Sequence, residues 1–136
     1  MTTTLDAATL SPGVAAAIED IKHDFEPAEF HVEPDNEGGA RVRFGPVPLG
    51  VQYHQRDTWL GGHIPTQIPY ADVYPIFLRG DLTRVDGKTL QAPLTSGHTF
   101  MGLSAVQASR RSNNRDATIE TVKLKFKKVL EWVNTQ

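Results

Sequence analysis

The chain contains no cysteine among its 136 residues. This absence excludes disulfide bonds, thiolate metal sites and a thiol nucleophile. Long apolar runs are missing as well, and no stretch approaches the roughly 20 residues that a membrane-spanning helix needs. A net charge of −2 provides no basic field for nucleic acid. We therefore expect neither a nucleic acid nor a membrane as partner.

What is present is typical of one folded domain. Hydrophobic residues make up 39% of the chain and charged residues 22%, which are ordinary values for a globular protein. Residues 1–10, "MTTTLDAATL", have neither the basic start nor the apolar core of a secretory signal. We expect them to be a flexible leader before a single domain over residues 11–136. With no sign of export, we expect the protein in the cytoplasm.

A helix is predicted directly after the leader. Ser11 suits the N-cap position and Pro12 the first helical position. Pro27 disfavours helical geometry in the residue before it and so ends the helix. Apolar residues recur at spacings of four, three and four, as on one helical face: Val14, Ile18, Ile21 and Phe25.

Strands are predicted in the following segments. "EFHVEP" (29–34) and "ARVRFG" (40–45) both alternate apolar and polar residues, which predicts an antiparallel hairpin around the turn "DNEGG". "GPVPLG" (45–50) predicts a bend. One strand or two short ones are expected within 51–65. "DVYPIFLRG" (72–80) predicts a short strand near a sheet edge or one preceded by a bend.

The remaining segments predict a loop and a helix. Residues 80–116 contain turn signals and little periodicity, and loops of such length are usually functional or disordered. Asp116 is the expected N-cap of the final helix. Its apolar stripe is Ile119, Val122, Phe126, Val129 or Leu130, and Val133. The lysines expected off that stripe, on a solvated face, are Lys123, Lys125, Lys127 and Lys128. The order of elements predicts an α+β domain.

This order resembles the fold of the ubiquitin-conjugating enzymes, called UBC-like below. "HIPTQIPYADVYPIFLR" (63–79) carries prolines and tyrosines at places similar to those of the family's "FP…YP…P" segment: Pro65, Pro69, Tyr70, Tyr74 and Pro75. "RDATIETVKL" (115–124) resembles the helix after the family's active loop, with Arg115 where the family has tryptophan. The resemblance implies an N-terminal helix, an antiparallel four-strand meander, a long active-site loop and a C-terminal helix.

The chain departs from the main family in having neither its His-Pro-Asn motif nor its cysteine. It is more similar to divergent bacterial members that are found beside ubiquitin-like modifiers and activating enzymes. Some of these carry a loop of the form G-x-S-x-x-Q-x-S-R-R-x-N in place of the cysteine. Here that loop reads "GLSAVQASRRSN" (102–113).

The resemblance implies that Ser104 replaces the catalytic cysteine, since it lies at a similar distance before Arg115. A serine hydroxyl must give its proton to a base as it attacks. His98 could take that proton or donate a hydrogen bond to the oxyanion, and His63 is a possible second base. The alternatives are a Ser104 bonded to backbone and a solvent-facing His98.

Other polar residues of the loop have two interpretations as well. Ser109 is the alternative nucleophile. Asn113 and Asn114 could stabilise an oxyanion, the role of the family's missing asparagine, or could simply form turns. The expected partner-binding residues are Arg110, Arg111 and Arg115, of which the first two could hold an acidic partner or the carboxyl tail of a modifier. Arginines on loops are also commonly just solvated.

Three functions remain open from the sequence. The first is an enzyme that carries a ubiquitin-like modifier as a serine oxyester and transfers it to a target. The second is a catalytically inactive adaptor that binds the modifier or an activating-enzyme-like protein. The third is a small interaction domain unrelated to conjugation. No cofactor is expected, and no metal, because no two histidines have the i, i+4 spacing of a helical zinc site.

Overall fold

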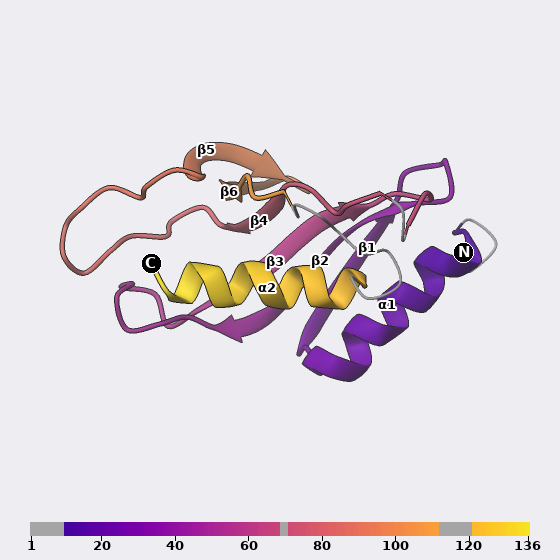
Figure 1. Ribbon diagram of the computed structural model, residues 1–136, viewed down its shortest axis with the longest axis horizontal. Coiled ribbons are helices and arrows are strands. Elements are labelled where there is room, and N and C mark those ends of the chain that lie inside the picture. Colours follow the sequence, from indigo (N-terminus) through magenta and orange to yellow (C-terminus); the bar gives the residue numbers. More distant parts are fainter. Residues whose placement is uncertain (1–9, 69–70, 112–120) are drawn as a thin grey trace.

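The computed structural model describes residues 10–68, 71–111 and 121–136 as two helices and six strands (Figure 1). In chain order these are α1 (Pro12–Phe25), β1 (Glu29–Pro34), β2 (Ala40–Pro48), β3 (Asp57–Ile64), β4 (Ile76–Arg79), β5 (Leu94–Phe100), β6 (Leu103–Ala108) and α2 (Val122–Asn134). The strands form one antiparallel sheet in the order β1-β2-β3-β4-β6-β5. Both helices lie on the same face of it. The predicted α+β class is confirmed, with two strands more than expected.

The first helix forms as the sequence predicts. Ser11 is its N-cap, and the Ser11 hydroxyl accepts a hydrogen bond from the Val14 N–H at 3.4 Å. At the other end, Glu26 turns into the left-handed region with φ 45° and donates its N–H to the Lys22 carbonyl. The buried face is Val14, Ala17, Ile18 and Ile21.

The first four strands form the predicted meander. β1 and β2 pair with Val32 opposite Val42. The expected bend over 45–50 is wrong, because β2 continues to Pro48 with a register shift between Phe44 and Val47. A bulge lets the strand pass Pro46 and resume its pairing with β3 at Val47. β4 is interior, between β3 and β6.

The expected long active-site loop over residues 80–116 is wrong over much of its length. β5 and β6 lie within it and form a hairpin. Met101 and Gly102 make its two-residue turn with φ values of 48° and 80°, the left-handed conformations that the twist of a tight hairpin requires. The alternation is hidden because the strands carry mostly small and polar residues, and because the register shifts between Thr95 and His98.

The core lies between the sheet and the helices. At its centre the Phe44 ring lies 5.0 Å from that of Phe25 in α1 and 5.1 Å from that of Phe126 in α2. Thr121 is the N-cap of α2 and accepts a hydrogen bond from the Leu124 N–H. The N-cap therefore lies five residues after Asp116, the expected cap, which is outside the described residues.

The solvated face expected for the lysines of α2 is wrong for Lys125, whereas Lys128 is exposed as expected. Lys125 is buried, with 4% of the residue exposed. Lys123 and Lys127 both reach Asp24 at the end of α1, and the hydrogen bond from Lys127 is the largest cause of the lowered pKa of Asp24. The lowered pKa of Asp24 is thus a consequence of the ion pairs that join the two helices.

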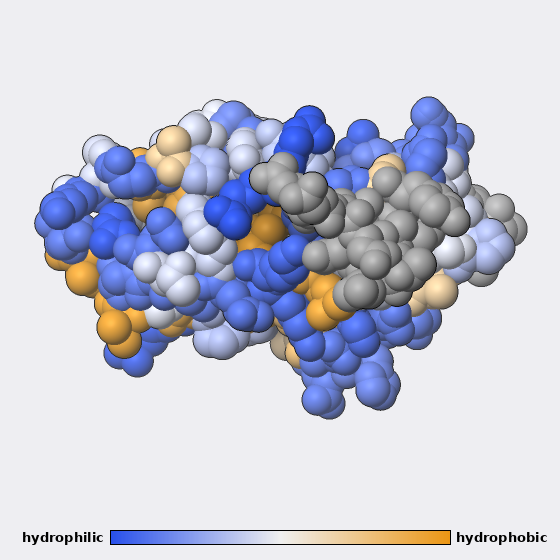
Figure 2. All heavy atoms as spheres, viewed as in Figure 1, coloured by the Kyte–Doolittle hydropathy of each residue, from blue (hydrophilic) through white to orange (hydrophobic). Residues whose placement is uncertain are grey.

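The helix-covered face of the molecule is largely hydrophilic on its outside (Figure 2). Apolar side chains show at the end where the β2–β3 connection lies, and Val51 in that connection is 95% exposed. Among the described residues, neither helix has the length and apolar character to cross a membrane.

Candidate functional site

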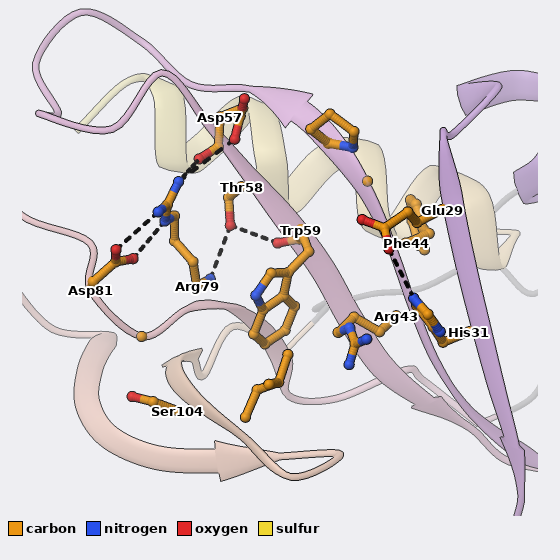
Figure 3. Close-up of a pocket in the computed structure, with 14 residues that line it drawn as sticks. Glu29, His31, Arg43, Phe44, Asp57, Thr58, Trp59, Arg79, Asp81 and Ser104 are labelled. Carbon is orange, nitrogen blue, oxygen red and sulfur yellow. Dashed lines mark hydrogen bonds and ion pairs between the residues drawn. The ribbon is translucent and has the colours of Figure 1, made fainter.

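The sheet face opposite the helices carries a cleft of about 660 Å³ (Figure 3). It runs from β1 and β2 across β3 to the turn of the β5–β6 hairpin. The side chains that matter for its chemistry are His31, Arg43, Trp59, Arg79, Leu103 and Ser104. Strand alternation explains the first three, since His31 and Arg43 are directly opposed and Trp59 lies two residues from the partner of Arg43 on β3.

One end of the cleft is closed by ion pairs. Arg79 donates two hydrogen bonds to Asp81, at 2.5 and 2.9 Å, and a third to the Asp57 carbonyl at 2.9 Å. Its guanidinium also lies 3.6 Å from the Asp57 carboxylate. The hydrogen bond with Asp81 is the main cause of a raised pKa at Arg79 and a lowered pKa at Asp81. The positive charge of Arg79 is therefore already balanced by the carboxylates of Asp57 and Asp81.

Arg43 stands at the other end and differs from Arg79 in having no such partner. Its guanidinium makes no ion pair or hydrogen bond within the part of the chain that the structure describes, and the side chain is half-buried. His31, opposite it, interacts with Glu29 at 3.4 Å. Arg43 is thus the positive charge that the cleft offers to a ligand.

An aromatic cluster supports the middle of the cleft. Phe100 at the tip of β5 stacks on Phe77 with ring centroids 4.5 Å apart and lies 6.3 Å from the Trp59 ring. The tip can approach so closely because Gly61 lies beneath it, where an added Cβ would come within 2.6 Å of the Phe100 ring. The cluster fixes the indole of Trp59 as a wall of the cleft.

Ser104 lies at the rim of this cleft, on β6 beside Gly80. A Cβ added at Gly80 would overlap the Ser104 side chain, so the serine packs against bare backbone. The residue is exposed, and its hydroxyl has no hydrogen-bond partner among the described residues. The hydroxyl is accessible, but no side chain in the described part of the chain hydrogen-bonds to it and could activate it.

His98 does not reach Ser104. The pairs His98–Ala105 and Thr99–Ser104 are adjacent rungs of the β5–β6 ladder, and neighbouring positions of a strand project to opposite faces. The His98 ring instead lies 2.9 Å from the Thr95 hydroxyl. The structure therefore places the two residues on one hairpin but does not form a serine–histidine pair.

The other expected site residues on the described chain lie elsewhere. The Ser109 hydroxyl accepts a hydrogen bond from Gln107 at 2.8 Å. Arg110 lies over the Trp132 ring at 4.7 Å and Arg111 over the Tyr74 ring at 4.0 Å. Neither guanidinium is in an ion pair within residues 10–68, 71–111 and 121–136, and both are exposed.

His63 is paired with a carboxylate. Its Nε2 lies 2.7 Å from Asp35 Oδ2, in the β1–β2 turn. Asp35 Oδ1 also accepts the N–H groups of Glu37 and Gly39. The hydrogen bond from His63 is the largest cause of a lowered pKa at Asp35, partly opposed by burial. The pair organises the turn, and within the described residues His63 makes no hydrogen bond to a hydroxyl of the β5–β6 hairpin.

Asn113, Asn114 and Arg115 lie outside the described residues, so their expected roles stay predictions. No group of three or more histidine, aspartate or glutamate side chains positioned for a metal occurs within the ranges that the structure describes. Comparison with models of known protein families, with curated proteins and with solved structures finds nothing that matches this chain.

Sequence reasoning missed the cleft, although a signal for part of it existed. The alternation of β2 already puts Arg43 on the face opposite the core, and Trp59 alternates with buried Leu60. Only the hairpin turn completes the cleft, and the hairpin was not predicted.

Proposed function

We propose that this chain is a UBC-like adaptor, a cytoplasmic binding module of a bacterial conjugation pathway that holds a ubiquitin-like modifier or its activating enzyme. The observation that carries the proposal is the presentation of Arg110 and Arg111. Each guanidinium lies over an aromatic ring, which orders the side chain before a partner arrives and leaves its N–H groups exposed. Such groups bind carboxylates in a bidentate manner.

The geometry favours an adaptor over an enzyme because no described residue is placed to act as a base for Ser104. His98 is bonded to Thr95 on the other face of the hairpin, and His63 is bonded to Asp35. A serine hydroxyl without a base is a weak nucleophile. Binding needs only the two arginines, whereas transfer needs a proton acceptor.

The adaptor proposal is tested by titrating the protein with its cognate modifier and, separately, with the activating enzyme, in a calorimeter. We expect one of them to bind, and the Arg110→Glu, Arg111→Glu double variant to bind at least about tenfold more weakly. Lys88→Glu, which reverses an exposed charge on the β4–β5 connection, should bind as the wild type does. If neither partner binds, or if the double variant binds equally well, the proposal fails.

A second candidate function is transfer through a Ser104 oxyester. It is favoured by one observation: the exposed Ser104 hydroxyl lies on the rim of the cleft, where an acyl group could be accommodated. In this reaction the hydroxyl oxygen would attack the activated C-terminal carbonyl of the modifier and displace its carrier. The hydroxyl proton would pass to water or to a base supplied by the partner.

Incubation with the modifier, the activating enzyme and ATP separates the two functions. If the protein is a transfer enzyme, a covalent adduct with the modifier should form. The adduct should survive thiol reductant, be cleaved by hydroxylamine and be lost in Ser104→Ala. An adduct that persists in Ser104→Ala but is lost in Ser109→Ala would move the nucleophile. The adaptor predicts binding without any adduct.

A further inference from the structure

The cleft on the open face has the size and lining of a small-molecule site. Its volume of about 660 Å³ lies within the range of roughly 300–1,000 Å³ that is common for ligand pockets. Its apolar wall includes Trp59 and Leu103, and Leu103 is 40% exposed although it is a large apolar residue. An apolar wall that stays in contact with solvent favours a ligand with an apolar body.

The charges along the cleft are distributed unevenly. At one end Asp57 and Asp81 enclose Arg79, so that end carries two carboxylates for one guanidinium. At the other end one carboxylate, that of Glu29 beside His31, stands against one guanidinium, and Arg43 has no partner among the described residues. An anion is therefore repelled from the Arg79 end and attracted to Arg43.

We propose that the cleft binds a small aromatic oxyanion. Its ring lies against the Trp59 indole and Leu103, and its carboxylate or phosphate accepts hydrogen bonds from the Arg43 guanidinium. The half-buried setting strengthens this contact relative to one in open water. Trp59 is held for this role by Phe100 and Phe77. The proposal is independent of the adaptor function, because Arg110 and Arg111 do not line this cleft.

The test follows the indole N–H resonance of Trp59 by nitrogen-15 NMR. The chain has two tryptophans, so Trp132→Phe leaves a single indole signal, which is then titrated with four probes. Two are aromatic anions, phenyl phosphate and phenylacetate, which compare the two oxyanions. Inorganic phosphate lacks the ring, and phenethylamine carries the opposite charge. We expect both aromatic anions to shift the resonance, with Kd values of about 1 mM or below.

Variants then assign the contacts. Arg43→Gln should weaken binding of the aromatic anions at least about tenfold, and Leu103→Glu, an exposed position that tolerates a charge, should do the same by repulsion. Arg56→Gln removes an exposed arginine outside the cleft and should bind normally. The proposal is overturned if neither aromatic anion shifts the Trp59 signal at concentrations up to about 10 mM. It is also overturned if phenethylamine or inorganic phosphate binds as tightly as the aromatic anions, or if Arg43→Gln binds the aromatic anions as the wild type does.

Discussion

Lys125 Nζ lies 2.9 Å from Asp72 Oδ2 and 2.7 Å from the Arg110 carbonyl oxygen, with 5% of the lysine side chain exposed. One ammonium group thereby joins three segments that are distant in sequence: helix α2, the segment before β4, and the segment after β6. A buried charge is tolerated only when it is paired and hydrogen-bonded. The contact fixes the backbone of Arg110, one of the two arginines of the adaptor proposal.

Lys125→Met should therefore destabilise the protein although methionine is apolar and of similar length. The substitution leaves the Asp72 carboxylate, 14% exposed, without this partner, and breaking a buried pair on one side costs about 3 kcal/mol. Denaturant unfolding measures the loss. Lys88→Met, at an exposed loop position, is the matched control. A change below about 0.5 kcal/mol for Lys125→Met would contradict the argument.

The Asp35–His63 pair predicts a pH dependence of stability. The pKa of Asp35 lies below its ordinary value of 3.8 in the folded protein, so the folded state favours the carboxylate. The resulting stabilisation is complete at pH values above the ordinary pKa of 3.8. It is lost as the pH falls through the lower pKa of the folded state. Asp35→Asn keeps a hydrogen-bond acceptor in the turn but cannot titrate.

Urea unfolding at a series of pH values below about 4 checks this prediction. The free energy of unfolding should fall less steeply with acid in Asp35→Asn than in the wild type. Part of the fall should remain, because the pKa values of Asp24, Asp81 and Asp86 are lowered as well. Glu37→Gln, in the same turn but exposed, should retain the wild-type slope, and equal slopes in all three proteins would refute the assignment.

Gly61→Ala should loosen the tip of the β5–β6 hairpin. The new methyl group would come within 2.6 Å of the Phe100 ring, and overpacking of this kind costs about 1–3 kcal/mol. Phe100→Leu in the same chain should recover part of the loss by making room. Gly13→Ala meets nothing within 4 Å and lies in α1, so this control should be neutral or stabilising. Thermal unfolding distinguishes the variants, and equal melting temperatures for the two alanine variants would rule out the clash.

Thr58→Val should lower the free energy of unfolding by about 1–3 kcal/mol, although valine has nearly the same shape as threonine. The Thr58 hydroxyl is buried, accepts the Arg79 backbone N–H at 2.9 Å and donates to the Trp59 carbonyl at 2.7 Å. Valine leaves both groups without this partner. Thr58→Ser retains the hydroxyl and loses only a methyl group, so equilibrium unfolding should rank serine above valine. The reverse order would show that packing outweighs the hydrogen bonds.

Local sequence signals predicted the first helix and the β1–β2 hairpin because those signals are redundant there. In α1 the cap, the proline and the apolar spacing all agree, and in the hairpin two alternating segments flank one turn. In β5 and β6 the same reasoning fails. Ser96 and Gly97 interrupt the alternation at the register shift, and in β6 the polar Ser104 stands two residues before the buried Val106, so Val106 and the small Ala108 alone mark its inner face.

The candidate site was harder to predict than the fold because it depends on register. A separation of six residues between His98 and Ser104 does not tell whether they share a face, and a tight two-residue turn places them on opposite ones. Lys125 shows the complementary case. Its position beside Phe126 is on the inner face of α2, but its charge predicts the outer one, and tertiary contacts such as those with Asp72 and the Arg110 carbonyl reverse that preference.

The contact between Gly80 and Ser104 has a consequence for how this cleft could diversify. Two of the smallest side chains meet there, at the junction of β4 and the hairpin and outside the hydrophobic core. A Cβ at position 80 would overlap the Ser104 Oγ, so any larger residue at position 80 must displace Ser104 or the hairpin. The shape of this rim of the cleft thus depends on one glycine that lies outside the hydrophobic core.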